Sequence, residues 1–184
     1  MIFEEKKITL KDGRIAVLKT PSISDAEKML SYIKKACGET DFLARYPEEW
    51  ESVSAESEAE WIKGNRESEG TLMITAYVDG EVVGNCQISR YGNMKTSHRA
   101  TIAIGILKEY WNMGIGSAMF REMIAAARKN PDISIVELDF VEGNTRAQAL
   151  YEKFGFKIVG ERPNAFKLKD GRLLSEYFMQ LQIR

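Results

Sequence analysis

Two glycines, Gly114 and Gly116, lie where an apolar segment starting at Ile104 gives way to a segment with helical periodicity. Because glycine has no side chain, several consecutive backbone N–H groups there can point outward unshielded. The helix predicted over residues 117–129 has no acidic residue before Glu122, although Asp and Glu usually occupy a first turn, near the positive end of the helix dipole. The spacing therefore indicates a loop whose amides bind an anion such as a phosphate.

The same glycines allow two other interpretations. They can simply let a helix pack close to a strand, and the glycines alone do not decide between packing and anion binding. Gly114-Ile-Gly116 with Glu137 about 20 positions later also imitates a dinucleotide-binding fingerprint. Against that, Met119 stands at the third glycine position and no second βαβ unit follows.

The elements around the loop follow from turn and periodicity signals. Asp12-Gly13 and Asp79-Gly80 predict hairpin turns between alternating strands. A helix is expected over residues 23–36, and Asn144 is expected to cap another helix that Gly155 ends. Further strands are predicted over residues 98–106, 134–141, 156–167 and 173–182.

Parallel pairing across the helical connections and antiparallel pairing across the hairpins predict an α/β (α+β) fold. We expect one mixed, mostly antiparallel sheet of about seven strands with helices on both faces. A chain of 184 residues suits a single domain, 1–184. Gly105, inside a predicted strand, suggests a bulge or a close approach by a ligand.

Composition excludes several classes of protein. With 26 Lys and Arg against 27 Asp and Glu, the chain shows no basic excess for nucleic-acid binding. Two cysteines and one histidine supply neither a disulfide framework nor a metal-ligand cluster, so no metal is expected. No apolar run reaches the ~20 residues of a membrane span and no signal-like start is present. We expect a cytoplasmic protein without a membrane partner, and leave a homodimer open.

Six glutamates lie between positions 48 and 60 with no Lys or Arg among them. Such a stretch can attract a cationic substrate, or it can be a solvated helix face.

Two motifs carry a family resemblance: Tyr110-Trp-Asn-Met-Gly-Ile-Gly116 and Asn144-Thr-Arg-Ala-Gln-Ala-Leu-Tyr-Glu-Lys-Phe-Gly-Phe156. In this order they resemble the acetyl-CoA pyrophosphate loop and the second conserved block of the GCN5-related N-acetyltransferase superfamily. The resemblance is strong over residues 98–160. One position departs from it, since Trp111 stands where the family usually has Arg or Gln.

The resemblance implies acetyl-CoA as cosubstrate. Its pyrophosphate is then expected on the backbone amides of the loop, and its pantetheine arm against one predicted strand, like an added strand. Asn144 is expected to contact the pantetheine arm as well as cap its helix. The implied cosubstrate-binding residues are Ile104, Gly105, Ile106, Asn112, Met113, Gly114, Ile115, Gly116, Ser117 and Asn144.

The resemblance also implies the catalytic groups. Tyr151 occupies the position of the acid that protonates the leaving thiolate, and its reference pKa of about 10 keeps it protonated at neutral pH. Asp139 lies five residues before Asn144, where the ribosomal-protein alanine N-acetyltransferase branch has a catalytic glutamate. Structural alternatives remain open: Tyr151 as a core aromatic and Asp139 as an outward-facing strand residue. Glu137 and His98 are rival bases.

These features predict an acetyl-CoA-dependent N-acetyltransferase in which a primary amine, on a small molecule or a protein N-terminus, attacks the thioester directly. The alternatives are a CoA-binding sensor or interaction module without turnover, and a dinucleotide-binding protein. Acceptor specificity is expected to depend on residues 37–66 and the last two strands.

Overall fold

The computed structural model describes all residues, 1–184, as four α-helices, three 3₁₀ turns and eight strands. The helices are α1 (Ala26–Gly38), α2 (Ala55–Glu67), α3 (Ile115–Lys129) and α4 (Thr145–Lys153). The turns are η1 (Ile23–Asp25), η2 (Pro47–Trp50) and η3 (Lys108–Tyr110). The strands are β1 (Lys6–Thr9), β2 (Ile15–Lys19), β3 (Thr71–Val78), β4 (Glu81–Arg90), β5 (Arg99–Ile106), β6 (Ile135–Val141), β7 (Lys157–Lys167) and β8 (Leu173–Gln182).

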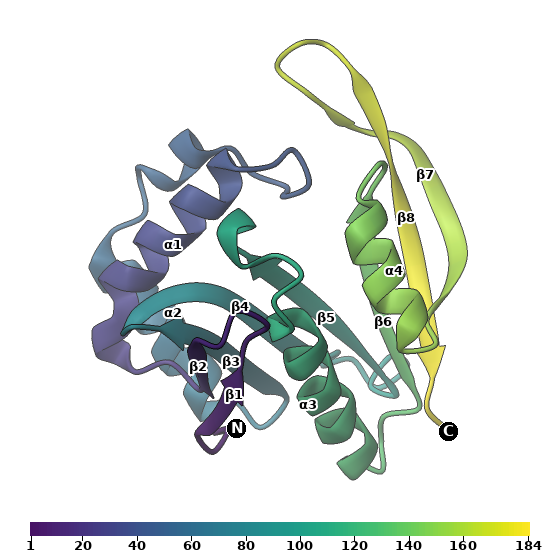
Figure 1. The fold of residues 1–184 in the computed structure, drawn as a ribbon. Helices are drawn as coiled ribbons and strands as arrows, with labels where there is room; N and C mark the ends of the chain where they lie inside the picture. Colours follow the sequence, from purple (N-terminus) through teal and green to yellow (C-terminus); the bar gives the residue numbers. More distant parts are fainter.

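All eight strands form one sheet in the order β1-β2-β3-β4-β5-β6-β8-β7. Every neighbouring pair is antiparallel except β5 and β6 (Figure 1). The mixed α/β architecture predicted from the sequence is thus confirmed. The sheet has eight strands rather than about seven, and the hairpin predicted around Asp12-Gly13 supplies two of them, β1 and β2.

The sheet splits between its two parallel strands. β5 and β6 pair only from Arg99 to Thr101 on one strand and Ile135 to Glu137 on the other. Beyond these residues β5 stays paired with β4 and β6 stays paired with β8, and the two halves diverge into a V (Figure 1). The edge of β5 that faces β6 is therefore left without a partner strand from Ile102 to Ile106.

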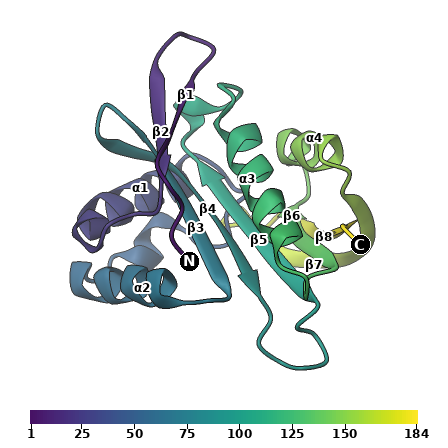
Figure 2. The ribbon, with the colours of Figure 1, turned by 90° about the horizontal axis from the view of Figure 1, so that it is seen from below.

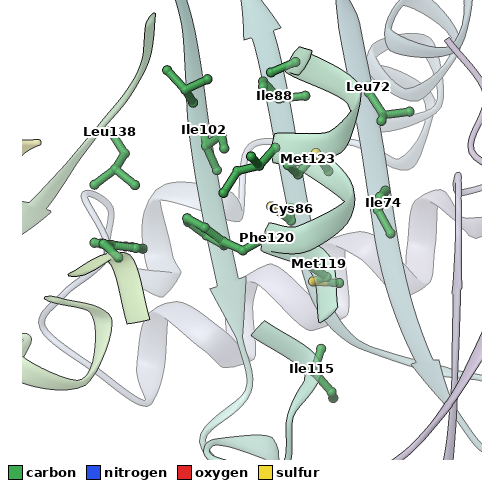
Figure 3. Packing of buried hydrophobic residues seen from close by; sticks show 14 of the residues in the cluster. Leu72, Ile74, Cys86, Ile88, Ile102, Ile115, Met119, Phe120, Met123 and Leu138 are labelled. Atoms are coloured by element: carbon green, nitrogen blue, oxygen red, sulfur yellow. The ribbon is translucent and has the colours of Figure 1, made fainter. Parts of the chain in front are cut away.

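Helices cover both faces of the sheet, α3 and α4 on one and α1 and α2 on the other (Figure 2). Phe120, Met119 and Met123 of α3 are fully buried against β-strand residues such as Ile88 and Ile102 (Figure 3). Burial of each such side chain contributes about 1.5–3 kcal/mol. A second cluster fills the space under α1 and α2. The α3 core holds the glycine loop against β5.

Two sequence predictions need correction. The helix expected over 23–36 begins as the 3₁₀ turn η1, because Ser22 and Asp25 form a capping box there, and α1 follows. The bulge expected at Gly105 is absent, since the β4–β5 register runs without a shift. A Cβ at Gly105 would instead lie 2.7 Å from the Tyr32 hydroxyl. A close approach at this glycine is therefore made by Tyr32 of α1, and Gly105 also lies beside the β5 edge that has no partner strand.

Candidate active site

A cavity of about 1160 Å³ lies between the diverging ends of β5 and β6. It is lined by all but two of the site residues predicted from the sequence: Ile104, Gly105, Ile106, Asn112, Gly114, Gly116, Ser117, Asp139, Asn144 and Tyr151. The exceptions, Met113 and Ile115, pack toward the core, and Ile115 is fully buried. One cavity thus brings together the glycine loop and the candidate catalytic groups, which are separated in sequence.

The loop before α3 has the geometry of an anion-binding site. Gly114 is the N-cap residue with φ of 102°, in the left-handed region that glycine adopts freely, and Asn112 also has a positive φ. No side chain caps α3 and no acidic residue lies in its first turn. The first amides of α3 are therefore left for a ligand.

The two glycines have different structural roles. A Cβ on Gly114 would meet no atom within 4 Å, so this residue is needed for its backbone conformation. A Cβ on Gly116 would lie 3.2 Å from Leu150 Cδ2 and 3.3 Å from Ile106 Cδ1. Close packing of α3 against α4 and β5 therefore requires glycine at 116. The packing interpretation of the glycines applies to Gly116, and it does not exclude anion binding.

Positive charge surrounds the cavity. Lys11, Arg121, Arg146 and Lys153 line it, and none of them forms an ion pair. Asp139 is the only carboxylate among the lining residues. These four cations were not predicted as site residues, because the overall composition of the chain is balanced and hides a local excess of positive charge. Such a local excess favours an anionic ligand.

The β6–α4 side of the cavity carries the polar side chains. Asn144 caps α4 by accepting a hydrogen bond from the Ala147 amide at 3.3 Å, as predicted. Tyr151 is only 6% exposed and stacks on Phe120 with 5.2 Å between ring centroids. Burial, and to a lesser degree the nearby Asp139, raises the pKa of Tyr151. The hydroxyl therefore keeps its proton at neutral pH and can donate it.

Asp139 is exposed on one face of β6. Leu138 and Phe140 are on the opposite face, where they are buried in the same core cluster as Tyr151. Strand register places Glu137 and Glu176 on the same face as Asp139. Each of them has its own cation, since Arg99 donates to Glu137 at 2.7 Å and Arg162 donates to Glu176 at 2.8 Å.

Asp139 has no such ion pair. Burial, followed by the Asp139 charge, raises the pKa of Glu176. Asp139 is therefore the carboxylate of this row without a cation of its own, and its side-chain partner is the neighbouring carboxyl of Glu176.

The two rival bases lie elsewhere. Glu137 lines a smaller cavity, which Asp139 also lines, and it accepts hydrogen bonds from Tyr91 at 2.6 Å and Arg99 at 2.7 Å. Burial raises its pKa, but these hydrogen bonds outweigh burial and leave the pKa below its ordinary value. A carboxylate held in this way is a poor proton acceptor. His98 lines neither cavity, and its carbonyl accepts from the Ser134 amide.

Trp111 and Arg146 form a contact that the sequence did not indicate. The Trp111 Nε1–H donates to the Ile106 carbonyl at 2.7 Å. The Arg146 guanidinium lies over the indole ring, 3.2 Å from its centroid. Arg146 belongs to the second motif, yet only the fold brings it to the first.

Two segments meet next to the cavity. Phe42 and Leu43 precede η2, Phe166 belongs to β7, and all three line the cavity. Lys169 pairs with Glu48, and the Lys169 amide donates to the Tyr46 hydroxyl at 3.0 Å. None of the six glutamates between positions 48 and 60 lines the cavity. We call the part of the cavity surface that is formed by Phe42, Leu43 and Phe166 the roof.

No group of three or more His, Cys, Asp and Glu side chains could hold a metal ion. No helix is long and apolar enough to cross a membrane.

The fold and cavity define an open mixed-sheet α/β protein whose binding site lies where the sheet splits. Residues 39–156 match the family described as "Acetyltransferase (GNAT) family". The chain therefore belongs to the GNAT acetyltransferase family and is an acyltransferase of the N-acetyltransferase type.

Individual proteins agree with this assignment. An L-amino acid N-acetyltransferase of Escherichia coli K12 is 29% identical over 119 residues, which cover 65% of this chain and 73% of that protein. A GNAT-family acetyltransferase from Streptococcus pneumoniae has the same fold, with a TM-score of 0.85 at 23% identity over 91% of this chain and 99% of its own. The structure of yncA from Salmonella typhimurium with its cofactor acetyl-CoA has a TM-score of 0.77 at 16% identity, covering 92% and 94% of the two chains.

Proposed function

We propose that this protein transfers the acetyl group of acetyl-CoA to a primary amine by direct attack. One observation carries the proposal: a single cavity joins an uncapped glycine-loop helix start, an unpartnered strand edge, Tyr151 and Asp139. Acetyl-CoA, when bound, supplies an activated thioester. The Salmonella structure with acetyl-CoA supports this choice of cosubstrate by likeness of fold.

The residues present fit this cosubstrate. Gly116 and Ser117 line the same cavity as the unpaired cations, and the uncapped amides at the start of α3 suit a pyrophosphate. The free edge of β5 from Ile104 to Ile106 suits the amide groups of a pantetheine arm, which pairs there like an added strand. Gly105 pairs with Asn85 of β4 and the Ile106 carbonyl is already engaged by Trp111, so the pairing relies on Ile104 and on the Ile106 amide.

The chemistry requires the acceptor nitrogen to lose one proton before attack and a second as the amide forms, and the leaving sulfur to gain one. The candidate groups suit the first and the last of these transfers, and the second nitrogen proton replaces the one that Tyr151 gives up. Asp139 accepts a proton from the acceptor ammonium, directly or through a water, because it has no cation of its own. The free amine nitrogen then forms a bond to the carbonyl carbon as the carbon–sulfur bond breaks. Tyr151 gives its proton to the departing sulfur, and its raised pKa ensures that it has one to give.

For the acceptor we propose a small amine. The roof brings the segment before η2 and the β7–β8 hairpin together beside the cavity, which leaves less room for a long peptide. The Escherichia coli relative is an L-amino acid N-acetyltransferase, which is consistent with a small acceptor. A protein N-terminus is the competing acceptor. The cytoplasmic location and the homodimer remain predictions.

Titration calorimetry with acetyl-CoA, followed by a thiol-release screen over amino acids, polyamines, aminoglycosides and N-terminal peptides, tests the function. Binding with release on one small-amine class is the expected result. Binding without release on any amine would favour a CoA-binding sensor. Binding of NAD but not acetyl-CoA would favour the dinucleotide-binding alternative and overturn the proposal.

A further inference from the structure

Trp111 raises a question about phosphate recognition. It occupies the loop position where the family usually supplies Arg or Gln, so the loop itself offers no cationic or amide side chain there. Its indole Nε1–H is engaged by the Ile106 carbonyl at 2.7 Å. A charged side chain for the phosphates must therefore come from another element or be missing.

Arg146 is the cation that stands out in the cavity. Lys11, Arg121 and Lys153 are exposed, whereas Arg146 is half-buried. Burial lowers the pKa of its guanidinium, and no carboxylate pairs with it. A partly buried cation without a counter-ion is costly, since desolvation is not offset by an ion pair. The cost is relieved when an anion binds beside it.

The stack with Trp111 gives Arg146 a defined position. Its guanidinium lies 3.2 Å from the indole centroid, so one face of the planar group is used for stacking. The N–H donors at its edge stay free, and they suit a bidentate contact to phosphate oxygens. Trp111 is three residues before Gly114 in the chain. The stack therefore holds the Arg146 donors in the same cavity that Gly114, Gly116 and Ser117 line at the start of α3.

We propose that Arg146, held on the Trp111 ring, binds the pyrophosphate of the CoA cosubstrate. The cation that the loop lacks is thereby supplied by α4, from the opposite wall of the cavity. This inference rests on the proposed function, because it assumes that acetyl-CoA is the ligand of the cavity. Trp111 is a positioning residue in this arrangement, and its hydrogen bond to Ile106 keeps the ring in place.

A comparison of three related ligands tests which phosphate Arg146 contacts. Acetyl-CoA has a pyrophosphate and a 3′-phosphate, acetyl-dephospho-CoA has only the pyrophosphate, and S-acetylpantetheine has neither. Calorimetry compares their affinities for the wild-type protein, Arg146→Gln and the matched control Arg121→Gln. Arg121 lines the same cavity from α3 and is equally unpaired, but it is exposed and does not stack on Trp111.

We expect Arg146→Gln to weaken acetyl-CoA binding roughly 10- to 100-fold, as for a lost charge-assisted hydrogen bond. The same loss is expected with acetyl-dephospho-CoA, and none with S-acetylpantetheine. Arg121→Gln should cost less with acetyl-dephospho-CoA than Arg146→Gln does. Trp111→Ala should weaken acetyl-CoA binding too, and the double variant should lose less than the product of the two single losses. Trp111→Phe, which keeps a ring, should retain most of the affinity.

The contrary outcomes are distinct. A loss that disappears with acetyl-dephospho-CoA would place Arg146 at the 3′-phosphate and overturn the inference. A loss that persists with S-acetylpantetheine would mean that Arg146 acts on the fold or the pantetheine arm, and would also overturn it. Unchanged affinity in Arg146→Gln would overturn the inference about Arg146 but leave the proposed function standing. Failure of the wild-type protein to bind acetyl-CoA would overturn the proposed function with it.

Discussion

The two walls of the cavity are built in different ways. The β5–α3 wall offers mainly backbone groups: the unpaired edge of β5 and the uncapped first turn of α3. The β6–α4 wall offers side chains, namely Asp139, Asn144, Arg146 and Tyr151. The start of α4 is closed by its own Asn144 cap, whereas the start of α3 is left open. Of the two helices that face the cavity, only α3 therefore has a free anion-binding end.

This difference suggests a division of labour. In the proposed function, backbone groups bind the pyrophosphate and the pantetheine arm of acetyl-CoA, and this binding needs only a particular chain conformation. Proton transfer needs side chains with suitable protonation states, which burial and neighbours can adjust. Substitutions of Tyr151 and Asp139 should therefore change rates, whereas substitutions in the glycine loop, and of Arg146 on the opposite wall, should change affinity.

The sharpest test of this division is Tyr151→Phe. Loss of the proton donor should lower kcat by about 10²- to 10⁴-fold, the range for a positioned acid. Acetyl-CoA affinity should change little, because the ring keeps its stacking on Phe120. Steady-state kinetics and calorimetry on the same samples provide the two readouts. An unchanged kcat would return Tyr151 to a purely structural role in the core.

Gly116→Val should give the opposite pattern. The new side chain meets Leu150 and Ile106, which forces the start of α3 away from its position. Loss of two hydrogen bonds from the first α3 amides to the pyrophosphate predicts a fall in acetyl-CoA affinity of about 100-fold or more. Overpacking should also lower stability by about 1–3 kcal/mol.

Calorimetry and circular dichroism melting separate the two effects of Gly116→Val. Leu150→Ala in the same background gives the chain room to relax, and partial recovery of affinity is expected. Normal affinity in Gly116→Val would mean that the phosphates bind elsewhere.

Glu137→Gln tests whether the β6 carboxylates differ in role. The pKa of Glu137 is lower in the folded protein than its ordinary value of 4.5. Its charge therefore adds stability above about pH 4.5, and this stability is lost as the pH falls through the lower folded-state pKa. Glu137→Gln should reduce the free energy of unfolding by roughly 2 kcal/mol at pH 7, and by much less at pH 3.

Urea unfolding at the two pH values measures the effect. Glu122→Gln is a suitable control, since Glu122 pairs with the exposed Lys6 and should contribute no more than about 1 kcal/mol. Equal losses for Glu137→Gln at both pH values would contradict the assigned role of its charge.

Asn144→Ala should have the smallest effect. Removal of the cap from α4 is expected to cost about 1 kcal/mol of stability. Asn144→Asp keeps the capping oxygen and should be close to wild type in thermal melting. An additional loss of acetyl-CoA affinity in Asn144→Ala, absent from Asn144→Asp, would support a contact to the pantetheine arm. A stability unchanged in both variants would show that the cap contributes nothing.

Much of the architecture was predictable because its signals are local. The Asp12-Gly13 and Asp79-Gly80 turns, the uncapped start of α3 and the Asn144 cap each depend on residues adjacent in the chain. Turn and cap geometry is set by such short-range interactions, so these features could be identified from residue types. The order of strands and crossovers then led to the mixed sheet.

Other features depend on residues that are distant in sequence and carry no local signal. The sequence suggested a bulge or a ligand at Gly105; the bulge is absent, and the group close to this glycine is Tyr32, which comes from α1. Asp139 and Glu137 alternate identically along β6, and only their neighbours on β5, β7 and β8 distinguish a free carboxylate from a paired one.

The sequence by itself therefore determined the kind of fold, the glycine loop and the identity of the family through its two motifs. The tertiary structure decided which carboxylate lies free at the cavity, and it brought Arg146 onto Trp111. The physical reason is that charge pairing, burial and stacking depend on distances between elements. Those distances are set by how β5 and β6 diverge and how α3 and α4 pack, which local residue patterns do not encode.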